Sequence, residues 1–560
     1  MPMIRLLPSP ATICCLGLLY ASALNADDAH EFVPDIVAED FAAHVRVLAS
    51  DEFGGRRPGT AGEQKTLQYL FAQFQRMGLE PGNGDSYLQK VPVQVRLADW
   101  TRSRAGVDLG GQAMALNFGT HVVLGSDTGQ SEVSVAHSPL VFVGYGINAP
   151  DQRWNDYAGT DVRGKTVLVL AGEPDVDSAQ RELFEGRRLT HYSRYGYKME
   201  EAARQGAVAA IIIHHTADVG YDWDGVKSRW HRTEFALRPG DSLGPRLNVQ
   251  GWIAADSARA LFAASGKNLS DLRRAAGRPG FKAEALGEAR FNATLKGKVV
   301  LGESNNFIAK LTGATYPGEA VLYSAHWDHL GAQEQKSGDN IYNGALDNAS
   351  GVAAILEIAA RFAAQRPKPE RTIVFFIPTL EEFGLLGSRY YIAHPVIPLA
   401  DTVADINFDM VVPVGRARDF VVIGYGYSEL DEVVKPIVDR LGRRISADKP
   451  ANGDSFFRSD HLNFARAGVP VLYMRGGVES AGTNAELAPP DEAWNRVASV
   501  YHTADDEFRS NWDLRGIAED ISVSYEVGRT LASSRDWPNY RHDHAFREFR
   551  DASREAARSR

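Results

Sequence analysis

Residues 375–391 read FFIPTLEEFGLLGSRYY, in which two neighbouring glutamates, Glu381 and Glu382, follow an apolar run. The run from Thr372 to Ile377 is rich in β-branched and aromatic residues, which predicts a buried strand. Neighbouring carboxylates repel each other, and solvated acids are common where strands end. The pair is therefore either a charged surface loop or part of a site, and the rest of the chain has to distinguish the two.

Strand and helix patterns alternate on both sides of this stretch, from about residue 297 to 535. A strand pattern, EAVLYSAHWDH at 319–329, is followed by a helix pattern, NASGVAAILEIAARFAA at 348–364. After the glutamates comes another strand pattern, ADTVADINFDMV at 400–411. Such alternation predicts an α/β fold with a mostly parallel central sheet flanked by helices.

With 560 residues, the chain is too long for one ordinary domain. Between about 115 and 290 the pattern changes to short buried strands separated by Gly, Asp and Pro, which indicates a smaller β-rich domain inserted in the main one. The expected organisation is a signal peptide at 1–26, the N-terminal part of the main domain at 27–114, the inserted domain at 115–290, the rest of the main domain at 291–535 and a charged C-terminal tail at 536–560. From Arg541 onward this tail is expected to be solvated or a frayed helix.

The N-terminus has the layout of a secretory signal peptide, with an uncleaved anchor as the alternative. Arg5 precedes the apolar stretch 11–19, and Ala-Ser-Ala at 21–23 offers a cleavage site. Both cysteines, Cys14 and Cys15, fall inside this segment, so the mature chain would contain none. An exported protein without cysteines suits a bacterium. We therefore expect a secreted or periplasmic bacterial protein that leaves the membrane after signal cleavage.

The formal net charge of −10 argues against nucleic acid or an anionic membrane as the main partner. The apolar fraction of 44% is normal for a chain with a sizeable buried core. Together these values favour a globular protein, and the sequence leaves its oligomeric state open.

Histidines and carboxylates follow several of the predicted strands or precede the helices after them. They are His326, Asp328, Asp347, Glu381, Glu382, Asp409 and His502. Strands of an open α/β sheet place their carboxyl ends along one edge, so these side chains should meet there. Nitrogen and oxygen donors without thiolates suit zinc, with cobalt or manganese as alternatives. A bridging carboxylate can hold two ions ~3.5–4 Å apart, as in some hydrolases. One glutamate of the pair would then be a ligand and the other a base.

The amino-acid sequences of five motifs support a more specific resemblance. SAHWDHLG, NGALDNASGVAAILEIA, PTLEEFGLLGSRYY, INFDMV and YHTADD occur in this order at ordinary domain spacing. Together they resemble the zinc-dependent metallopeptidase family 28, which includes aminopeptidase Y, the Streptomyces- and Vibrio-type aminopeptidases and the glutamate carboxypeptidases. The resemblance spans roughly residues 38–535, and its region 115–290 looks like the protease-associated domain that some members carry as an insertion.

This resemblance implies two zinc ions and a role for each motif residue. His326 and Asp409 would hold one ion, Glu382 and His502 the other, and Asp347 would bridge both. Glu381 would be the general base, and Asp328 would orient His326. Two further residues rest on weaker patterns. Tyr501 would hydrogen-bond the oxyanion or simply pack, and His461, in RSDHLNF, would contact substrate or be a structural loop histidine.

The resemblance favours an aminopeptidase that acts on peptides. A carboxypeptidase or dipeptidase of the same family is the first alternative, because only recognition of the substrate terminus differs. Such enzymes hold carboxylates with arginines, for which Arg389, Arg458 and Arg475 are candidates. A catalytically dead binding protein of the transferrin-receptor type is the alternative from another class, and retention of every ligand position argues against it.

Overall fold

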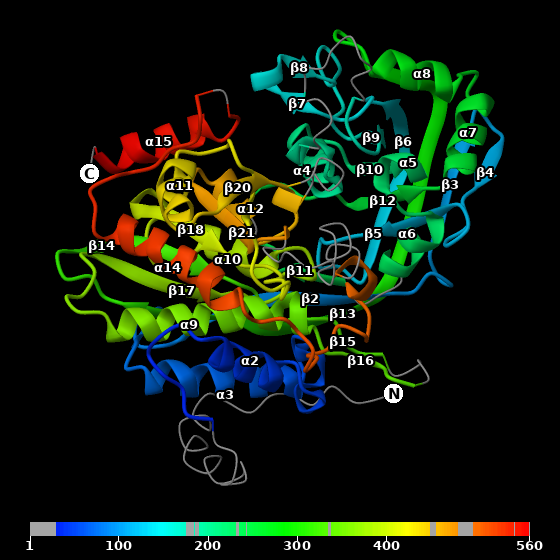
Figure 1. Cartoon of the computed structure of the whole chain (residues 1–560). Coiled ribbons are helices and arrows are strands. Elements are labelled where there is room, and N and C mark those ends of the chain that lie inside the picture. The colour runs from blue at the N-terminus through cyan, green and yellow to red at the C-terminus, as the bar shows by residue number, and fades with distance from the viewer. Residues whose placement is uncertain are drawn as a thin grey trace.

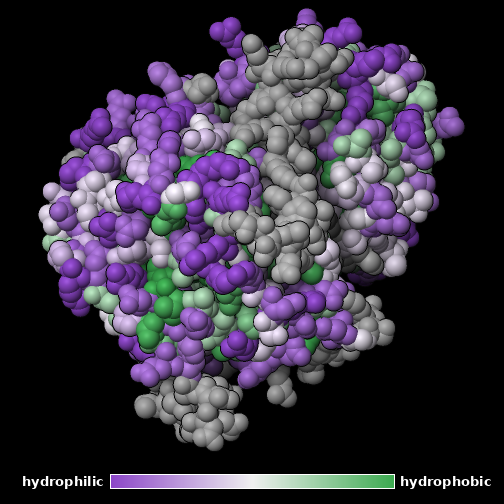
Figure 2. Space-filling view, viewed as in Figure 1, coloured by the Kyte–Doolittle hydropathy of each residue, from purple (hydrophilic) through white to green (hydrophobic). Residues whose placement is uncertain are grey.

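A computed structural model of the chain describes residues 30–174, 184, 190–230, 234–241, 244–333, 338–448, 455–479, 497–542 and 544–558 (Figure 1). The predicted signal peptide and both cysteines lie outside these residues. Within them, no helix combines the length and the apolar character needed to cross a membrane. On the face shown in Figure 2, hydrophilic residues cover most of the described surface and hydrophobic residues appear in small groups.

The central sheet is mostly parallel, as the alternating patterns predict. Strand β17 (Arg371–Ile377) pairs in parallel with β14 (Tyr316–Ser324), which pairs in parallel with β18 (Thr402–Asn407). Strand β21 (Val471–Gly476) continues the parallel part beside β18. Antiparallel strands close it on both sides: β13 (Glu284–Leu311) beside β17, and β19 (Asp419–Ile423) beside β21. The short strand β20 (Arg444–Ala447) pairs with β19. The predicted fold class is therefore confirmed.

Helices cover both faces of this sheet because its strands are apolar on both sides. Ile373, Phe375 and Ile377 of β17 belong to one buried cluster, and Val374 and Phe376 to another on the opposite face. The first cluster takes in α2 (Ala38–Leu48), α3 (Ala61–Arg76), α9 (Gly351–Ala364), α11 (Leu430–Arg440) and α14 (Ile517–Ala532). The second takes in α10 (Leu386–Ala393) and α12 (His461–Arg466). This arrangement is the three-layer packing of an α/β domain.

A second unit has its own sheet and its own core; we use this name for the elements from β3 (Arg104–Leu109) to the first half of β13, except β11. Its parallel strands run in the order β6 (Glu132–Phe142), β9 (Thr166–Leu170), β10 (Ala209–Ile213) and β12 (Val249–Ile253). The antiparallel strand β5 (Val122–Gly125) follows β12. Helices α4 (Tyr195–Arg204), α7 (Ala255–Ala264) and α8 (Leu269–Ala276) complete it. The domain limits of 115 and 290 stay a prediction.

The long strand β13 connects the two units (Figure 1). Its residues 284–296 pair with β6 and β3 in the second unit, and its last residues pair with β17. Between these parts it pairs with β2 (Leu88–Ala98), so that a two-stranded ribbon bridges the units. Strand β11 (Glu234–Leu237) pairs with β2, although its place in the sequence is among elements of the second unit. The chain thus crosses between the units more than once.

The C-terminal stretch contains a packed helix, where a solvated or frayed helical tail was expected. Helix α15 (Arg547–Arg558) packs against the main unit, and Arg550 is buried. Its guanidinium donates to the backbone oxygens of Thr402 (3.1 Å) and Val403 (3.3 Å) at the start of β18, and it lies beside the ring of Trp537. Strand carbonyls that need donors and an aromatic face explain why so charged a segment docks.

We predict that Gly528→Ala destabilises the main unit, because helix α14 packs directly on the sheet there. A methyl group at Gly528 would collide with the hydroxyl of Tyr323, which donates to the backbone oxygen of Ser524 at 2.9 Å. Overpacking of this kind costs about 1–3 kcal/mol, which thermal unfolding should show as a lower Tm. Thr530→Ala, on the exposed side of the same helix, is the control, and an equal Tm for both variants would contradict the packing argument.

Candidate active site

The predicted site residues meet at the carboxyl ends of three neighbouring strands. His326 lies just beyond β14, the pair Glu381 and Glu382 just beyond β17, and Asp409 just beyond β18. Asp347 lies in the buried turn Ala345–Ser350, which leads into α9. His502 joins them from the segment before α14. Strands that are parallel neighbours end at the same edge, which is why motifs far apart in the sequence converge.

Asp347 lies between the two histidines. Its Oδ1 atom is 3.3 Å from Nε2 of His326, and its Oδ2 atom is 3.2 Å from Nε2 of His502. Around His326, the nearest carboxylate oxygens of Asp409 and Glu381 are 3.7 and 3.9 Å from the same nitrogen. On the other side, Glu382 Oε2 is 2.9 Å from Nε2 of His502. One carboxylate therefore faces two separate groups of donors.

These donors fit a metal. Two groups have donor atoms within 4.8 Å of one another: His326 with Glu381 and Asp409, and His329 with Asp347 and Glu382. The Nε2 atoms of His326, His329 and His502 are buried and have no hydrogen-bond partner among the described residues. Buried polar atoms normally have partners, so unpaired imidazole nitrogens facing carboxylates indicate zinc-type ligands.

Burial and charge act in opposite directions on the pKa values of these groups. Burial lowers the pKa of His326, but the carboxylates around it, with Glu381 the largest, outweigh this and hold the pKa well above its usual value. Burial raises the pKa of Glu382, yet the two neighbouring histidines, with His502 the larger, bring it down to about 2. For Glu381, burial and the nearby acids together raise the pKa well above the usual range. The two adjacent glutamates thus differ in their electrostatics.

Asp328 contacts two members of the first group, Glu381 and His326. Its Oδ1 accepts a hydrogen bond from the backbone N–H of Glu381 at 3.1 Å, and its side chain is fully buried. Nδ1 of His326 lies 3.1 Å from the backbone oxygen of Asp328 and 3.9 Å from its carboxylate. The orienting contact with the histidine is therefore made by the main chain, while the carboxylate fixes the loop that carries Glu381.

Two supporting residues escaped the sequence reasoning. His329 Nδ1 is 2.5 Å from Glu382 Oε1, so this histidine holds the glutamate predicted as a ligand. Asp506 accepts hydrogen bonds from the backbone N–H groups of Leu346 (2.8 Å) and Asp347 (3.0 Å) and thereby fixes the turn below the shared carboxylate. Both belong to motifs already noted, SAHWDHLG and YHTADD, in which the second histidine and the second aspartate were the available signals.

A third missed residue, Arg56, lies behind the site. Its buried guanidinium donates hydrogen bonds of 2.6–2.9 Å to four backbone oxygens, which are those of Leu48, Trp327, Asn343 and Gly344. Trp327 stands next to His326, and Gly344 begins the turn that contains Asp347. One side chain therefore ties the N-terminal segment to the two loops that present these residues.

The structure places Tyr501 and His461, the two residues predicted from weaker patterns, in different surroundings. Tyr501 lies at the surface of the site, with its ring stacked on that of His502 at 3.8 Å between centroids. His461 is completely buried between Phe456 and Tyr473, with Nδ1 3.2 Å from the amide nitrogen of Asn407. A histidine with no exposed surface cannot touch a substrate, so the substrate role expected for His461 is corrected to a packing role.

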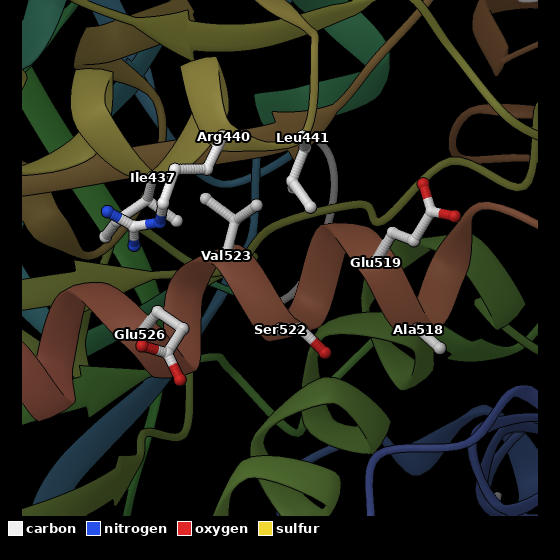
Figure 3. Close-up of a pocket in the computed structure, with 8 residues that line it drawn as sticks. All are labelled: Ile437, Arg440, Leu441, Ala518, Glu519, Ser522, Val523 and Glu526. Carbon is white, nitrogen blue, oxygen red and sulfur yellow. The ribbon is translucent and has the colours of Figure 1, made fainter.

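A shallow groove elsewhere on the molecule contains none of these residues. It runs between α11 and α14, with Ile437, Leu441 and Val523 along its floor and charged side chains such as Glu519 at its edge (Figure 3). Its polar side chains, such as Glu519 and Ser522, belong to neither group of possible metal ligands, so the candidate active site remains the cluster at the strand ends.

We predict that Arg56→Lys lowers both stability and zinc affinity. A lysine keeps the charge but cannot donate to all four carbonyls, and each buried carbonyl left without a donor costs about 1–3 kcal/mol. The free energy of unfolding should fall by about 2 kcal/mol or more in denaturant titrations. Arg46→Lys is the control, since it makes the same change at an exposed position near the end of α2. Unchanged stability and zinc affinity in Arg56→Lys would contradict the role of this contact.

Comparison with known proteins agrees with the motifs. Residues 306–525 match the model of Peptidase family M28. Leupeptin-inactivating enzyme 1 of Streptomyces exfoliatus is 28% identical over 267 residues, which are 45% of this chain and 56% of that protein. An aminopeptidase from Aneurinibacillus sp. strain AM-1 has 20% sequence identity and a TM-score of 0.45, covering 88% of this chain and 94% of its own.

The other curated relatives correct the expected location. The vacuolar membrane protease of Candida dubliniensis is 33% identical over 250 residues, 44% of this chain and 23% of that protein, and proteins of the same name from further yeasts also match. Their name points to a vacuolar membrane, so the prediction of a secreted or periplasmic bacterial protein is wrong by this comparison. The chain spans about half or less of the length of these curated relatives.

The family match covers every residue of the site, from His326 to His502, and the N-terminal segment and second unit lie before it. The order of the motifs, the convergence of their side chains and the family match all concern the same part of the chain: residues 306–525 are similar to Peptidase family M28.

Proposed function

We propose that the protein is a dizinc metallo-exopeptidase, and specifically an aminopeptidase that removes N-terminal residues from peptides. The observation that carries the proposal is Asp347, whose two oxygens face His326 and His502 at almost equal distances of 3.3 and 3.2 Å. A carboxylate in this position is suited to bridge two ions. His326 and Asp409 would complete one site, and Glu382 and His502 the other. Zinc at these positions would polarise the scissile carbonyl and acidify a water molecule.

The chain's own residues would divide the remaining work. Glu381 belongs to the first group of donors, but His326, Asp409 and the shared Asp347 would supply the ligands of that ion without it. Its carboxylate would then take the proton of the attacking water and pass it to the leaving amine. Asp328 would keep Glu381 in place through the backbone N–H of that residue. Tyr501, exposed beside His502, would donate its hydroxyl to the developing oxyanion. Residues 115–290 would form an inserted protease-associated domain.

The arginines bear on the choice between an aminopeptidase and a carboxypeptidase or dipeptidase. Arg389 donates to Glu200 at 2.7 Å, and Nε of Arg475 donates to the hydroxyl of Tyr473 at 2.9 Å. Tyr473 in turn donates to the backbone oxygen of Asp409 at 3.1 Å. Both guanidinium groups therefore already bind other side chains of the protein. Neither is needed to explain binding of a substrate carboxylate, which supports the aminopeptidase. Retention of all the proposed ligands and of Glu381 speaks against a dead binding protein.

We expect the purified protein to hydrolyse aminoacyl chromogenic amides and free-amino peptides, with about two zinc ions per chain. A panel of these substrates should be compared with N-blocked peptides and with peptides carrying a free carboxyl terminus, each with and without a chelator. Activity on the blocked peptides alone would favour a carboxypeptidase. No turnover of any substrate, with zinc bound, would favour a binding protein. One zinc ion under metal-replete conditions would contradict the bridging role of Asp347.

We predict that substitutions of the two adjacent glutamates have different effects on turnover and on metal binding. Glu381→Gln should retain both metal ions and lose turnover by about 10²- to 10⁴-fold, because an amide cannot take the proton of the water. Glu382→Gln should instead weaken zinc binding, and excess zinc should restore part of its activity. Elemental analysis and steady-state kinetics on both variants measure the two effects.

The two variants are each other's controls, since they make the same chemical change one residue apart. If Glu381→Gln loses metal while Glu382→Gln keeps both ions, the roles of base and ligand are reversed. If both variants remain active, neither glutamate has the role proposed for it.

A further inference from the structure

A carboxylate of the second unit lies between two helices of the main unit. Glu200, on α4, accepts a hydrogen bond from Arg389 of α10 at 2.7 Å through Oε1, and its Oε2 accepts from Arg466 at the end of α12. Figure 1 shows α4 on the side of the second unit that faces the main sheet. Glu200 is only 21% exposed, and although burial raises its pKa, the two arginines outweigh this and hold the pKa below its usual value. It therefore stays charged in the folded protein.

Helix α10 is joined rigidly to the loop that carries Glu381 and Glu382. The N–H of Leu385 donates to the backbone oxygen of Glu381, and the N–H of Gly387 donates to that of Thr379, both at 3.0 Å. Gly387 is packed so closely on Thr379 that a Cβ atom would collide with its backbone oxygen. A displacement of α10 would therefore move the glutamates.

Helix α12 is linked to α10 by polar side chains. The hydroxyl of Ser388 donates to Asp460, and the amide of Asn463 donates to the hydroxyl of Ser388 at 2.8 Å and to Leu385 O at 3.2 Å. Arg389 and Arg466 come from different helices, so one carboxylate that binds both fixes how these helices sit against the second unit. Isolated surface ion pairs contribute little, whereas a shared network with restricted geometry can hold a position.

A second contact reaches the loop itself. Phe235 of β11 packs against Phe383, the residue directly after Glu382, with ring centroids 4.7 Å apart. The guanidinium of Arg57 lies 4.9 Å from the centre of the Phe383 ring. The glutamate loop is thus held by β11 on one side and, through α10, by α4 on the other.

We propose that the second unit positions the catalytic glutamates, and that Glu200 is the positioning residue through which it does so. The unit would then be required for the chemical step rather than only for substrate access. The activity part of this inference rests on the proposed function. The structural part, that Glu200 sets the placement of α10 and with it of Glu382, stands independently of it.

The test compares Glu200→Gln with Glu201→Gln. Glu201 is the next residue on the same helix, and its described bonds stay within the second unit: to Asn148 (3.3 Å), Arg204 (2.8 Å) and Gln205 (2.7 Å). Damage confined to the second unit should therefore appear in Glu201→Gln, and loss of the contact between units only in Glu200→Gln. Arg389→Gln and the double variant Glu200→Gln/Arg389→Gln complete a mutant cycle.

At saturating zinc and well below the unfolding temperature, Glu200→Gln should lower kcat by about fivefold or more, because small misplacements of catalytic groups cost up to about 10²-fold. KM should change by less than about twofold, since substrate binding is not the step affected. Arg389→Gln should behave alike, the double variant should add little, and Glu201→Gln should keep near-normal kcat. Equal kcat losses in Glu200→Gln and Glu201→Gln, or an additive double variant, would overturn the proposal.

Zinc affinity provides the readout that does not need turnover. Titration of the metal-free protein with zinc should show weaker binding in Glu200→Gln than in Glu201→Gln, because the loop that carries Glu382 is no longer held. If the wild-type protein hydrolyses no peptide, the proposed function fails, yet this difference still decides the positioning role. Wild-type zinc affinity in Glu200→Gln would overturn it.

Discussion

The site depends on one buried cation. The guanidinium of Arg56 is enclosed by backbone oxygens from three segments, and it connects the N-terminal segment with the loop after β14 and the turn before α9. Burial lowers its pKa to about 10, and the acids Asp506 and Asp347 partly oppose this effect, so the group remains charged. Because a guanidinium donates in several fixed directions, it sets the spacing of these loops, and that spacing determines where His326 and Asp347 face each other.

Around Arg56, the fold holds several buried carboxylates close together although they repel one another. Backbone N–H groups bind the supporting acids Asp328 and Asp506, and imidazole rings separate the others. The remaining repulsion is what a pair of divalent cations would neutralise. Buried like charges that have neither partners nor ions would destabilise the protein, so metal binding and folding of these loops should be coupled.

Much of this could be predicted from the sequence. The run from Ile373 to Ile377 is apolar at every position because β17 is covered on both faces, and that pattern predicted a buried strand. That His326, Asp347, Glu382, Asp409 and His502 lie close together could be predicted because they stand next to recognisable strands and helices, whereas their roles as metal ligands rest on the family resemblance and stay a proposal. The C-terminal segment was misjudged because its many charges suggested solvent, whereas Arg550 is buried on strand carbonyls that no sequence pattern reveals.

The sequence by itself therefore determined the fold class, the strand-end location of the site and the types of donor in it, because hydrophobic periodicity and ligand chemistry are local properties. The tertiary structure alone decided that His461 is buried, that His329 holds Glu382, and that Glu200 of the second unit binds the helices behind the glutamates. These contacts join residues that are up to 266 positions apart. Which residues meet in these contacts depends on how the sheets and helices pack, and this cannot be inferred from the type of each side chain.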